Sequence, residues 1–283
     1  MSLDINKSTE TNFAQVGDVQ IAWRSTGQGQ PLLMLNRFRA AIDDWDPQLI
    51  AALARTYQVI TFDSAGVAAS GGNVPDTLEG AADIAIGLAQ AIGLDRPHVL
   101  GWSMGGMIAQ ILAAKYGDQI GGVILAGTTP SFALEGTVPT AQEWLATATK
   151  EVNTPEDMQF LFYADTETSR SAGLSSLARI GQGDATAGAA SKTTMQTVAA
   201  QGAATRKFFF GEDGAFKQLG KINVPVLVAN GDQDRAFAVE NSVALVRALP
   251  NARLAIYPDA GHAFLFQHAD QFAQDVTQFL SEI

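Results

Sequence analysis

Three short stretches of this 283-residue chain carry side chains that can act together in catalysis. Ser103 lies in GWSMGG, Asp234 in GDQD and His262 in DAGH. A serine hydroxyl is a weak nucleophile near neutral pH and needs a base, which an imidazole supplies. A carboxylate on the far side of the imidazole would fix its tautomer and stabilise the imidazolium that forms. The three residues therefore predict nucleophilic attack on a carbonyl carbon.

The surroundings of Ser103 are typical of a sharp turn from a strand into a helix. Such a turn needs small neighbours, because a Cβ at the flanking positions would collide with the strand or the helix, and Gly101 and Gly105 meet that need. A helix from Met104 onward would aim its amino end at whatever Ser103 holds. The pattern G-x-S-x-G also arises by chance, as a glycine-rich turn with an incidental serine. The order Ser, Asp, His along the chain favours the catalytic interpretation.

Other histidines and acids compete for the same roles. His98 falls in an apolar strand and is expected to be structural, whereas His268 falls at a helix start and is expected to be solvated. Asp232 lies within the tight turn itself, and Asp259 is three residues before the histidine, where a local turn contact is more typical. We therefore expect Asp234 to be the acid.

These residues need a scaffold that brings distant segments together. Short aliphatic runs alternate with longer amphipathic ones, which predicts an α/β fold with a mostly parallel central sheet flanked by helices. The expected strands span residues 20–25, 31–36, 58–63, 98–102, 121–126, 224–230 and 253–257. The carboxyl ends of parallel strands share one edge of the sheet, so Ser103, Asp234 and His262 are expected to converge there.

Two helices are indicated by their periodicity. Asp76 and Glu79 resemble a capping box before an apolar stripe that starts at Leu78. The last helix carries a similar stripe. Its members are Phe272, Val276, Phe279 and Leu280.

The short apolar runs that predict strands stop at residue 128 and resume at residue 222. The intervening segment is rich in Ala, Thr, Ser and Gly, with helical patches at 142–149 and 157–163. We expect residues 128–221 to form a helical cap, or lid, inserted between two parts of one core domain, 1–127 and 222–283.

Composition excludes several classes of partner. The net charge of -11 argues against nucleic acid. The chain has no Cys, its start is polar and acidic, and no apolar run approaches the ~20 residues of a membrane span. A cytoplasmic protein acting on a small molecule is expected. Neither a metal nor an organic cofactor is expected, because no His-rich ligand set or phosphate-cradling loop is present.

Taken together, the chain resembles the α/β-hydrolase superfamily, and within it the lid-bearing serine esterases, lactonases and cofactor-free perhydrolases or haloperoxidases. The resemblance covers nearly the whole chain. Its matching pieces are an opening hairpin over 19–35, DDWDPQL, VITFDSAGVAASG, GWSMGG, VPVLVANGDQD and YPDAGHAFLFQHADQF. It implies a triad of Ser103, Asp234 and His262, with the backbone amides of Phe38 and Met104 as the oxyanion hole. Ser103 argues against haloalkane dehalogenases and epoxide hydrolases, which use aspartate there.

The chain departs from the family pattern at two loops. Asn36-Arg37 stands where the family usually has His-Gly, whose glycine lets an amide approach the oxyanion, and Ala68 stands where another glycine is common. Losing one oxyanion donor costs about 3 kcal/mol of transition-state stabilisation. The change at Ala68 is expected to affect only loop conformation.

The candidate pocket residues are mostly aromatic. Arg37 or Arg39 could contact a substrate carboxylate, but we expect both to be solvated or paired with the nearby Asp43 and Asp44. The aromatic candidates for an apolar pocket are equally well explained as packing. They are Trp102, Phe132 and Trp144.

These observations predict a hydrolase that cleaves an ester, thioester or lactone of a small, largely apolar compound through an acyl-enzyme. The same triad would also serve perhydrolysis, carbon-carbon bond hydrolysis or a lyase reaction. A receptor that keeps the pocket without catalysis is the alternative from another class.

Overall fold

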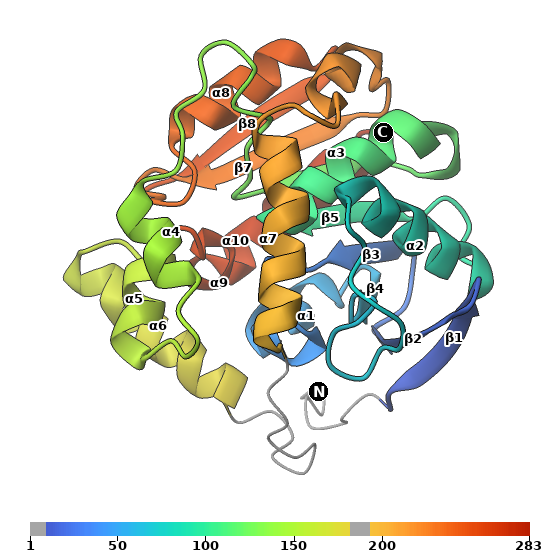
Figure 1. Cartoon of the computed structure of the whole chain (residues 1–283), viewed down its shortest axis with the longest axis horizontal. Coiled ribbons are helices and arrows are strands. Elements are labelled where there is room, and N and C mark those ends of the chain that lie inside the picture. The colour runs from blue at the N-terminus through green and yellow to red at the C-terminus, as the bar shows by residue number, and fades with distance from the viewer. Residues whose placement is uncertain (1–9, 182–192) are drawn as a thin grey trace.

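The computed structural model describes residues 10–181 and 193–283, and in this part of the chain eight strands form one sheet (Figure 1). The strand order is β1-β2-β4-β3-β5-β6-β7-β8. Pairing is antiparallel from β1 to β4 and parallel from β4 to β8, which confirms the predicted mostly parallel sheet. The strands are β1 Asn12–Val16, β2 Val19–Thr26, β3 Pro31–Leu35, β4 Gln58–Phe62, β5 His98–Trp102, β6 Val123–Ala126, β7 Val226–Gly231 and β8 Ala252–Tyr257.

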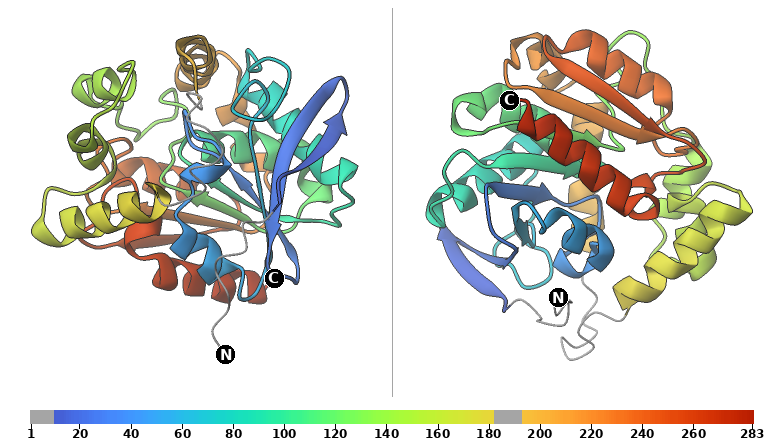
Figure 2. Two further views of the ribbon diagram at one scale, coloured as in Figure 1. Left: turned by 90° about the horizontal axis from the view of Figure 1, so that it is seen from below. Right: turned by 180° about the vertical axis from the view of Figure 1, so that it is seen from behind.

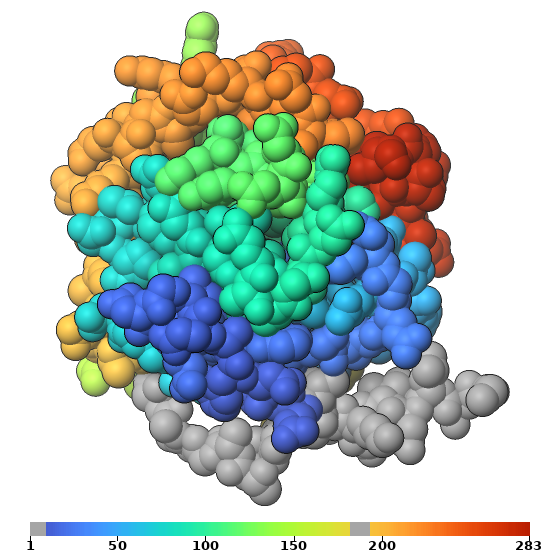
Figure 3. All heavy atoms as spheres, turned by 90° about the vertical axis from the view of Figure 1, so that its right-hand side faces the viewer, coloured from blue at the N-terminus to red at the C-terminus, as the bar shows by residue number. Residues whose placement is uncertain are grey.

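The predicted hairpin over residues 19–35 is wrong. β4 lies between β2 and β3, and the antiparallel partner of β2 at the sheet edge is β1, which the sequence did not indicate. β1 is an edge strand with mostly exposed or half-exposed side chains, so it lacks the apolar run that marks the inner strands. Figure 3 shows this edge, where α2 (Leu78–Ala91) packs beside β1.

The inner strands are buried on both faces, which is why they read as continuous apolar runs. Helices α1 (Pro47–Leu53) and α10 (Ala269–Ser281) cross in front of the strands in the right-hand view of Figure 2. α2 and α3 (Met104–Tyr116) pack together on the opposite face. The apolar stripe predicted for the last helix is buried, as expected. The remaining core helices are η1 Ile42–Asp44, η2 Gly117–Gln119, α8 Val239–Ala248 and α9 Phe264–Gln267.

α2 begins one residue later than the predicted capping box. Thr77 is the N-cap, and its hydroxyl accepts a hydrogen bond from the amide of Gly80 at 3.1 Å. Its extended backbone, with φ of -138°, is the conformation that an N-cap requires. Asp76 therefore lies outside the helix, while Glu79 keeps its place in the first turn.

The described part of the segment between β6 and β7 consists of helices joined by loops, with no strand. The two predicted helical patches are confirmed as α4 (Gln142–Ala148) and α5 (Pro155–Phe162), followed by α6 (Glu167–Gly181), α7 (Met195–Phe209) and η3 (Ala215–Lys221). The left-hand view of Figure 2 shows α4, α5 and α7 together on one side of the sheet. Residues 182–192 of the predicted cap lie outside the described residues. The division into core and cap stays a prediction.

A partly buried ion pair joins this helical segment to the core. The carboxylate of Asp46, which is fully buried at the start of α1, accepts bonds of 2.9 and 2.6 Å from the guanidinium of Arg179 on α6. The same carboxylate caps α1 through the amide of Gln48. None of the helices in residues 10–181 and 193–283 has the length and apolar content to cross a bilayer.

Candidate active site

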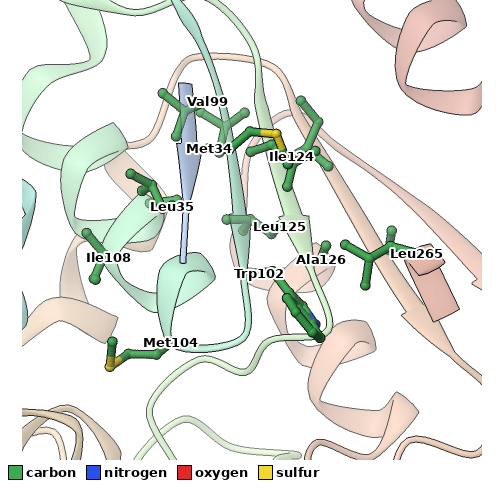
Figure 4. Close-up of a cluster of buried hydrophobic side chains, with 14 of the residues drawn as sticks. Met34, Leu35, Val99, Trp102, Met104, Ile108, Ile124, Leu125, Ala126 and Leu265 are labelled. Atoms are coloured by element: carbon green, nitrogen blue, oxygen red, sulfur yellow. The ribbon is translucent and has the colours of Figure 1, made fainter. Parts of the chain in front are cut away.

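Ser103 occupies the turn between β5 and α3 and has a strained backbone. Its φ of 59° and ψ of -118° are values that residues other than glycine rarely adopt. A Cβ on Gly101 would lie 2.2 Å from the carbonyl oxygen of Gly105, and one on Gly105 would lie 2.1 Å from that of Leu35. The glycines are thus required by close backbone approach, as the motif predicts. Figure 4 shows Trp102 and Met104 leaving this turn in opposite directions.

Gly105→Ala is expected to lower the free energy of unfolding by about 2–4 kcal/mol, because backbone atoms cannot move aside as a flexible side chain can. Urea denaturation measures this. Gly202→Ala on α7 is the matched control: its Cβ would meet nothing within 4 Å. Alanine also favours a helix over glycine, so the control protein should be at least as stable as the wild type. Equal stability of the two variants would show that the turn tolerates a side chain.

His262 and Asp234 form a buried pair. Nδ1 of His262 lies 2.8 Å from Oδ2 of Asp234, and their side chains are 1% and 0% exposed. The other carboxylate oxygen of Asp234 accepts hydrogen bonds from the amides of Ala236 and Phe237 at 2.7 and 3.0 Å. The carboxylate is therefore held by three donors and fixes the orientation of the ring.

The competing acids do not contact the imidazole in the described structure. Asp232 instead accepts a hydrogen bond from the amide of Ala260 at 3.1 Å. Asp259 adopts a left-handed backbone, with φ of 55°, and its carbonyl accepts from the side chain of Gln267. Both aspartates shape the loops that carry Asp234 and His262.

Four aromatic rings surround the imidazole of His262 at centroid distances of 5.6–5.9 Å. They belong to Trp102, Trp144, Phe162 and Phe237. Nε2 is buried and has no hydrogen-bond partner among the described residues. With Nδ1 occupied by Asp234, Nε2 is the ring nitrogen available for proton transfer.

The other two histidines lie elsewhere. Nδ1 of His98 accepts a hydrogen bond from the amide of Gly122 at 2.9 Å, and burial lowers the pKa of the ring, which confirms a structural role. His268 is half-buried rather than solvated, because its ring lies against Tyr257 and Nε2 is 3.2 Å from the carbonyl oxygen of Pro258.

The loop after β3 folds without the glycine that the family usually has at the position of Arg37. The amide group of Asn36 bridges the carbonyl of Phe62 and the indole of Trp45, each at 2.7 Å. The next four residues form a turn closed by the amide of Ala40 and the carbonyl of Arg37 at 3.2 Å. The left-handed position in this turn is Arg39, with φ of 63°, so Arg37 itself does not need the freedom of glycine.

The side chain and backbone of Arg39 hold this turn against the helical segment. Its backbone amide donates to Oε1 of Gln201 on α7 at 2.9 Å. Its guanidinium donates to three carbonyl oxygens at and beyond the end of α4, at distances of 2.6–3.1 Å. They are those of Ala148, Lys150 and Glu151. Ala68, the second departure, is also left-handed, with φ of 46°, which fits the expected effect on loop conformation.

The backbone amides of Phe38 and Met104 are available to a ligand. Neither donates to an acceptor in the part of the chain that the structure describes. Both residues line a cavity together with Ser103. Met104 is the first residue of α3, where unpaired amides and the helix dipole favour negative charge.

The expectation that Arg37 and Arg39 are solvated or paired with Asp43 and Asp44 is confirmed in part: Arg37 forms a long ion pair with Asp44, whereas the guanidinium of Arg39 binds carbonyl oxygens. Arg39 binds the carbonyls given above, and Asp43 pairs with Arg24 at 2.6 Å. Nη2 of Arg37 is 3.9 Å from Oδ1 of Asp44, too long for a hydrogen bond, and the Arg37 side chain is only 12% exposed. Burial lowers the pKa of both guanidinium groups.

Two cavities meet at Ser103. The first, which we call the polar cavity, has a volume of about 300 Å³ and is lined by Arg37, Arg39, Ser103 and His262 among others. The second, the apolar cavity, has a volume of about 640 Å³. Its lining includes Met104, Met107, Phe132, Trp144, Phe209 and Phe237. Phe38 and Trp144 line both cavities.

Of the aromatic residues predicted to line a pocket, Phe132 lines one of the two cavities and Trp102 lines neither. Phe132 lines the apolar cavity and stacks on Phe209 with centroids 4.7 Å apart. Trp102 lines neither cavity: it is buried beneath the site, where its indole N–H donates to the carbonyl oxygen of His262 at 3.1 Å. Its position at the end of β5 points it into the core, as Figure 4 shows.

Sequence reasoning missed several residues around the site. Phe237 carries a detectable signal, because it follows Asp234 by three residues in the same loop. No sequence signal marks Phe162 or Gln201 as a site residue, because both reach the site from helices whose packing cannot be deduced from periodicity. Within residues 10–181 and 193–283, no three acidic or histidine side chains are grouped as metal ligands.

Comparison with known proteins supports the family assignment. Residues 30–269 match the alpha/beta hydrolase fold family. A non-heme haloperoxidase from Rhodococcus erythropolis is 27% identical over 274 residues, which cover 92% of this chain and 96% of that protein. A 2-hydroxy-6-oxo-6-phenylhexa-2,4-dienoate hydrolase from Burkholderia cepacia is 24% identical over 302 residues, covering 98% and 99%. The structure of an alpha/beta hydrolase fold protein from Chitinophaga pinensis has a TM-score of 0.81 at 27% identity, covering 98% of each chain. The resemblance inferred from the sequence is thereby confirmed, and the chain belongs to the alpha/beta hydrolase fold family.

Proposed function

We propose that this protein is a serine hydrolase that cleaves a carboxylic ester, thioester or lactone of a small, largely apolar compound. The observation that carries the proposal is the buried His262–Asp234 pair, whose free Nε2 borders the same cavity as Ser103. A base with one nitrogen oriented by a carboxylate and the other unoccupied is the arrangement that serine activation requires.

The reaction would proceed in two halves. Nε2 of His262 takes the proton of Ser103 as the hydroxyl oxygen attacks the carbonyl carbon, and the amides of Phe38 and Met104 donate to the oxyanion. The imidazolium then gives the proton to the leaving group, which departs and leaves an acyl-enzyme. Water then attacks the acyl carbon and gives a proton to Nε2 of His262, the imidazolium returns that proton to the leaving oxygen of Ser103, and the carboxylic acid is released. Asp234 stays ionised throughout and stabilises the imidazolium.

The apolar cavity suggests how substrates are selected. Its aromatic and methionine side chains favour a hydrocarbon group over a polar one. Each CH₂ group buried there contributes about 0.8 kcal/mol, which corresponds to a three- to fourfold gain in kcat/KM. A proposed cap built from α4 and α7 would cover this hydrocarbon, because both helices supply lining residues.

A panel of p-nitrophenyl esters with acyl chains of two to twelve carbons tests the proposal. We expect kcat/KM to rise about three- to fourfold with each added CH₂ until the cavity is full. Lactones of graded size test the cyclic substrates in parallel. If no ester or lactone is turned over and a fluorophosphonate leaves the protein unlabelled, while small ligands bind saturably, the protein is a receptor rather than a hydrolase.

Perhydrolysis is the second candidate, favoured by the similarity to the haloperoxidase from Rhodococcus erythropolis over nearly the whole chain. Hydrogen peroxide would then replace water in the second half-reaction and release a peracid. The ratio of peracid to acid formed from one ester at a fixed peroxide concentration separates the two. The similarity to the dienoate hydrolase makes carbon-carbon bond hydrolysis a third reaction to assay with the same protein.

A further inference from the structure

The guanidinium of Arg37 uses few of its hydrogen-bond donors. Nη1 donates to the carbonyl oxygen of the adjacent Phe38 at 2.8 Å. Nε is buried and has no partner among the described residues, and the nearest carboxylate oxygen in an ion pair, on Asp44, is 3.9 Å from Nη2. A guanidinium carries five N–H groups and remains charged in proteins. The side chain is thus a largely buried cation whose ion pair with Asp44 is too long for a hydrogen bond, so its unused N–H groups are available to the carboxylate of a ligand.

Aromatic stacking holds this cation beside the reacting groups. The guanidinium carbon lies 4.8 Å from the ring centre of Phe162 and 5.4 Å from that of Trp102. The same two rings lie 5.9 and 5.7 Å from the imidazole of His262. Arg37, Ser103 and His262 all line the polar cavity. A ligand group that reaches Arg37 would therefore lie a few carbon atoms from the carbonyl at Ser103.

The second arginine of this wall makes it more positive. Arg39 also lines the polar cavity, and the hydrogen bonds of its guanidinium in the described structure go to neutral carbonyls rather than to carboxylates. The chain as a whole carries a net charge of -11, so it repels anions at long range. The lining also includes one acidic residue, Glu151, so the two guanidinium groups outnumber the carboxylates of this cavity and favour an anion there.

We propose that Arg37 binds a carboxylate on the acyl portion of the substrate. The substrate class is then an ester, thioester or lactone of a short dicarboxylic or oxo-acid, with its free carboxylate in the polar cavity. The uncharged portion on the other side of the carbonyl lies in the apolar cavity. The 300 Å³ of the polar cavity limits the acyl chain to a few carbons between the two carboxyl carbons. This inference rests on the proposed function of Ser103.

Two esters of nearly equal size distinguish the effect of the free carboxylate on kcat/KM from the effect of chain length. Mono-p-nitrophenyl glutarate has a free carboxylate, and p-nitrophenyl methyl glutarate has the same carboxyl blocked. The wild-type protein should show a kcat/KM at least about tenfold higher for the free carboxylate, and Arg37→Gln should reduce that ratio by about 10- to 100-fold, mainly through KM. Arg37→Lys, which keeps the charge but loses the planar fork, should give an intermediate ratio.

The ratio isolates carboxylate binding from damage to the neighbouring loop. Arg37 also holds the carbonyl of Phe38, so a substitution can slow both esters, but such a loss cancels between them. Arg55→Gln is the matched control, because Arg55 is 61% exposed on the surface and should leave the ratio unchanged. An unchanged ratio in Arg37→Gln, or a wild-type preference for the methyl ester, would overturn the inference and leave Arg37 as a stacking residue.

A binding measurement keeps the test independent of catalysis. In calorimetry, the Ser103→Ala protein should bind monomethyl glutarate and not dimethyl glutarate, and adding Arg37→Gln should abolish that binding. If the esters are not cleaved but this binding is seen, the carboxylate site stands and the proposed reaction fails. If the esters are cleaved without any dependence on Arg37, the reaction stands and the carboxylate site fails. Equal binding of the two glutarates would count against the site in either case.

Discussion

Replacing Ser103 with alanine is expected to lower kcat for p-nitrophenyl esters by a factor of about 10⁴ or more, to the level of the remaining oxyanion and binding contributions. The substitution removes the only atom proposed to form the acyl-enzyme. KM should change little, since the hydroxyl contributes little to substrate binding. Steady-state kinetics on one well-cleaved ester measures both parameters.

The control for this experiment is Ser242→Ala. Ser242 is also buried, but it lies in α8 and lines neither the polar nor the apolar cavity, and its hydroxyl has no hydrogen-bond partner in the described structure. Its removal should leave kcat within about twofold, because no bond is lost. Activity that survives in folded Ser103→Ala protein would mean that another nucleophile or direct attack by water is responsible.

The second large effect is expected at Asp234. Asp234→Asn should reduce kcat by a factor of about 10³–10⁴, because an amide can donate to Nδ1 of His262 and would place the ring proton on Nε2. Nε2 would then lack the lone pair that accepts the serine proton. The size and packing of the side chain are nearly unchanged, so the effect reports the tautomer rather than a cavity.

Asp232→Asn gives the matched comparison, two residues away in the same loop. Asp232 accepts a hydrogen bond from the amide of Ala260 and does not contact the imidazole. We expect less than about a fivefold change in kcat, with a small loss of thermal stability from the weakened bond. Similar losses in the two variants would indicate that the loop as a whole, and not the Asp234–His262 bond, supports activity.

The parts of this fold that sequence predicts well are those where burial dictates residue type. β3, β5, β6 and β7 lie inside a sheet covered on both faces, so only apolar residues fit there. β1 escaped prediction because an edge strand has few buried positions and its five residues do not alternate clearly. Pairing order is not encoded locally, which is why residues 19–35 resembled a hairpin although β4 separates its two strands.

The site residues likewise fall into those that the local sequence predicts and those that depend on distant contacts. Ser103 and its glycines belong to one short stretch whose steric demands are local, so the motif is visible in the sequence. The role of Arg39 is not visible, because it depends on carbonyls at the end of α4 and on Gln201 of α7, more than a hundred residues away. The environment of Arg37 likewise follows from Phe162, which arrives from α5. Long-range packing of the helical segment decides both.

Arg37 and Arg39 also explain how this loop keeps its backbone conformation without glycine. Other members of the family are expected to use glycine after β3 so that an amide can approach the oxyanion. Here Arg39 adopts the left-handed conformation, and its contacts with the helical segment compensate for the strain. Phe38 therefore lies beside a residue that is tied to the helical segment, it lines the apolar cavity, and its amide has no acceptor among the described residues.

Covalent labelling tests the central claim most directly. The protein is incubated with a fluorophosphonate, its intact mass is measured, and the modified residue is located by peptide sequencing. We predict one adduct per chain, on Ser103, and none in the Ser103→Ala variant. Absence of an adduct on the folded wild-type protein, or an adduct at any other residue, would contradict the assignment of Ser103 as the nucleophile activated by His262.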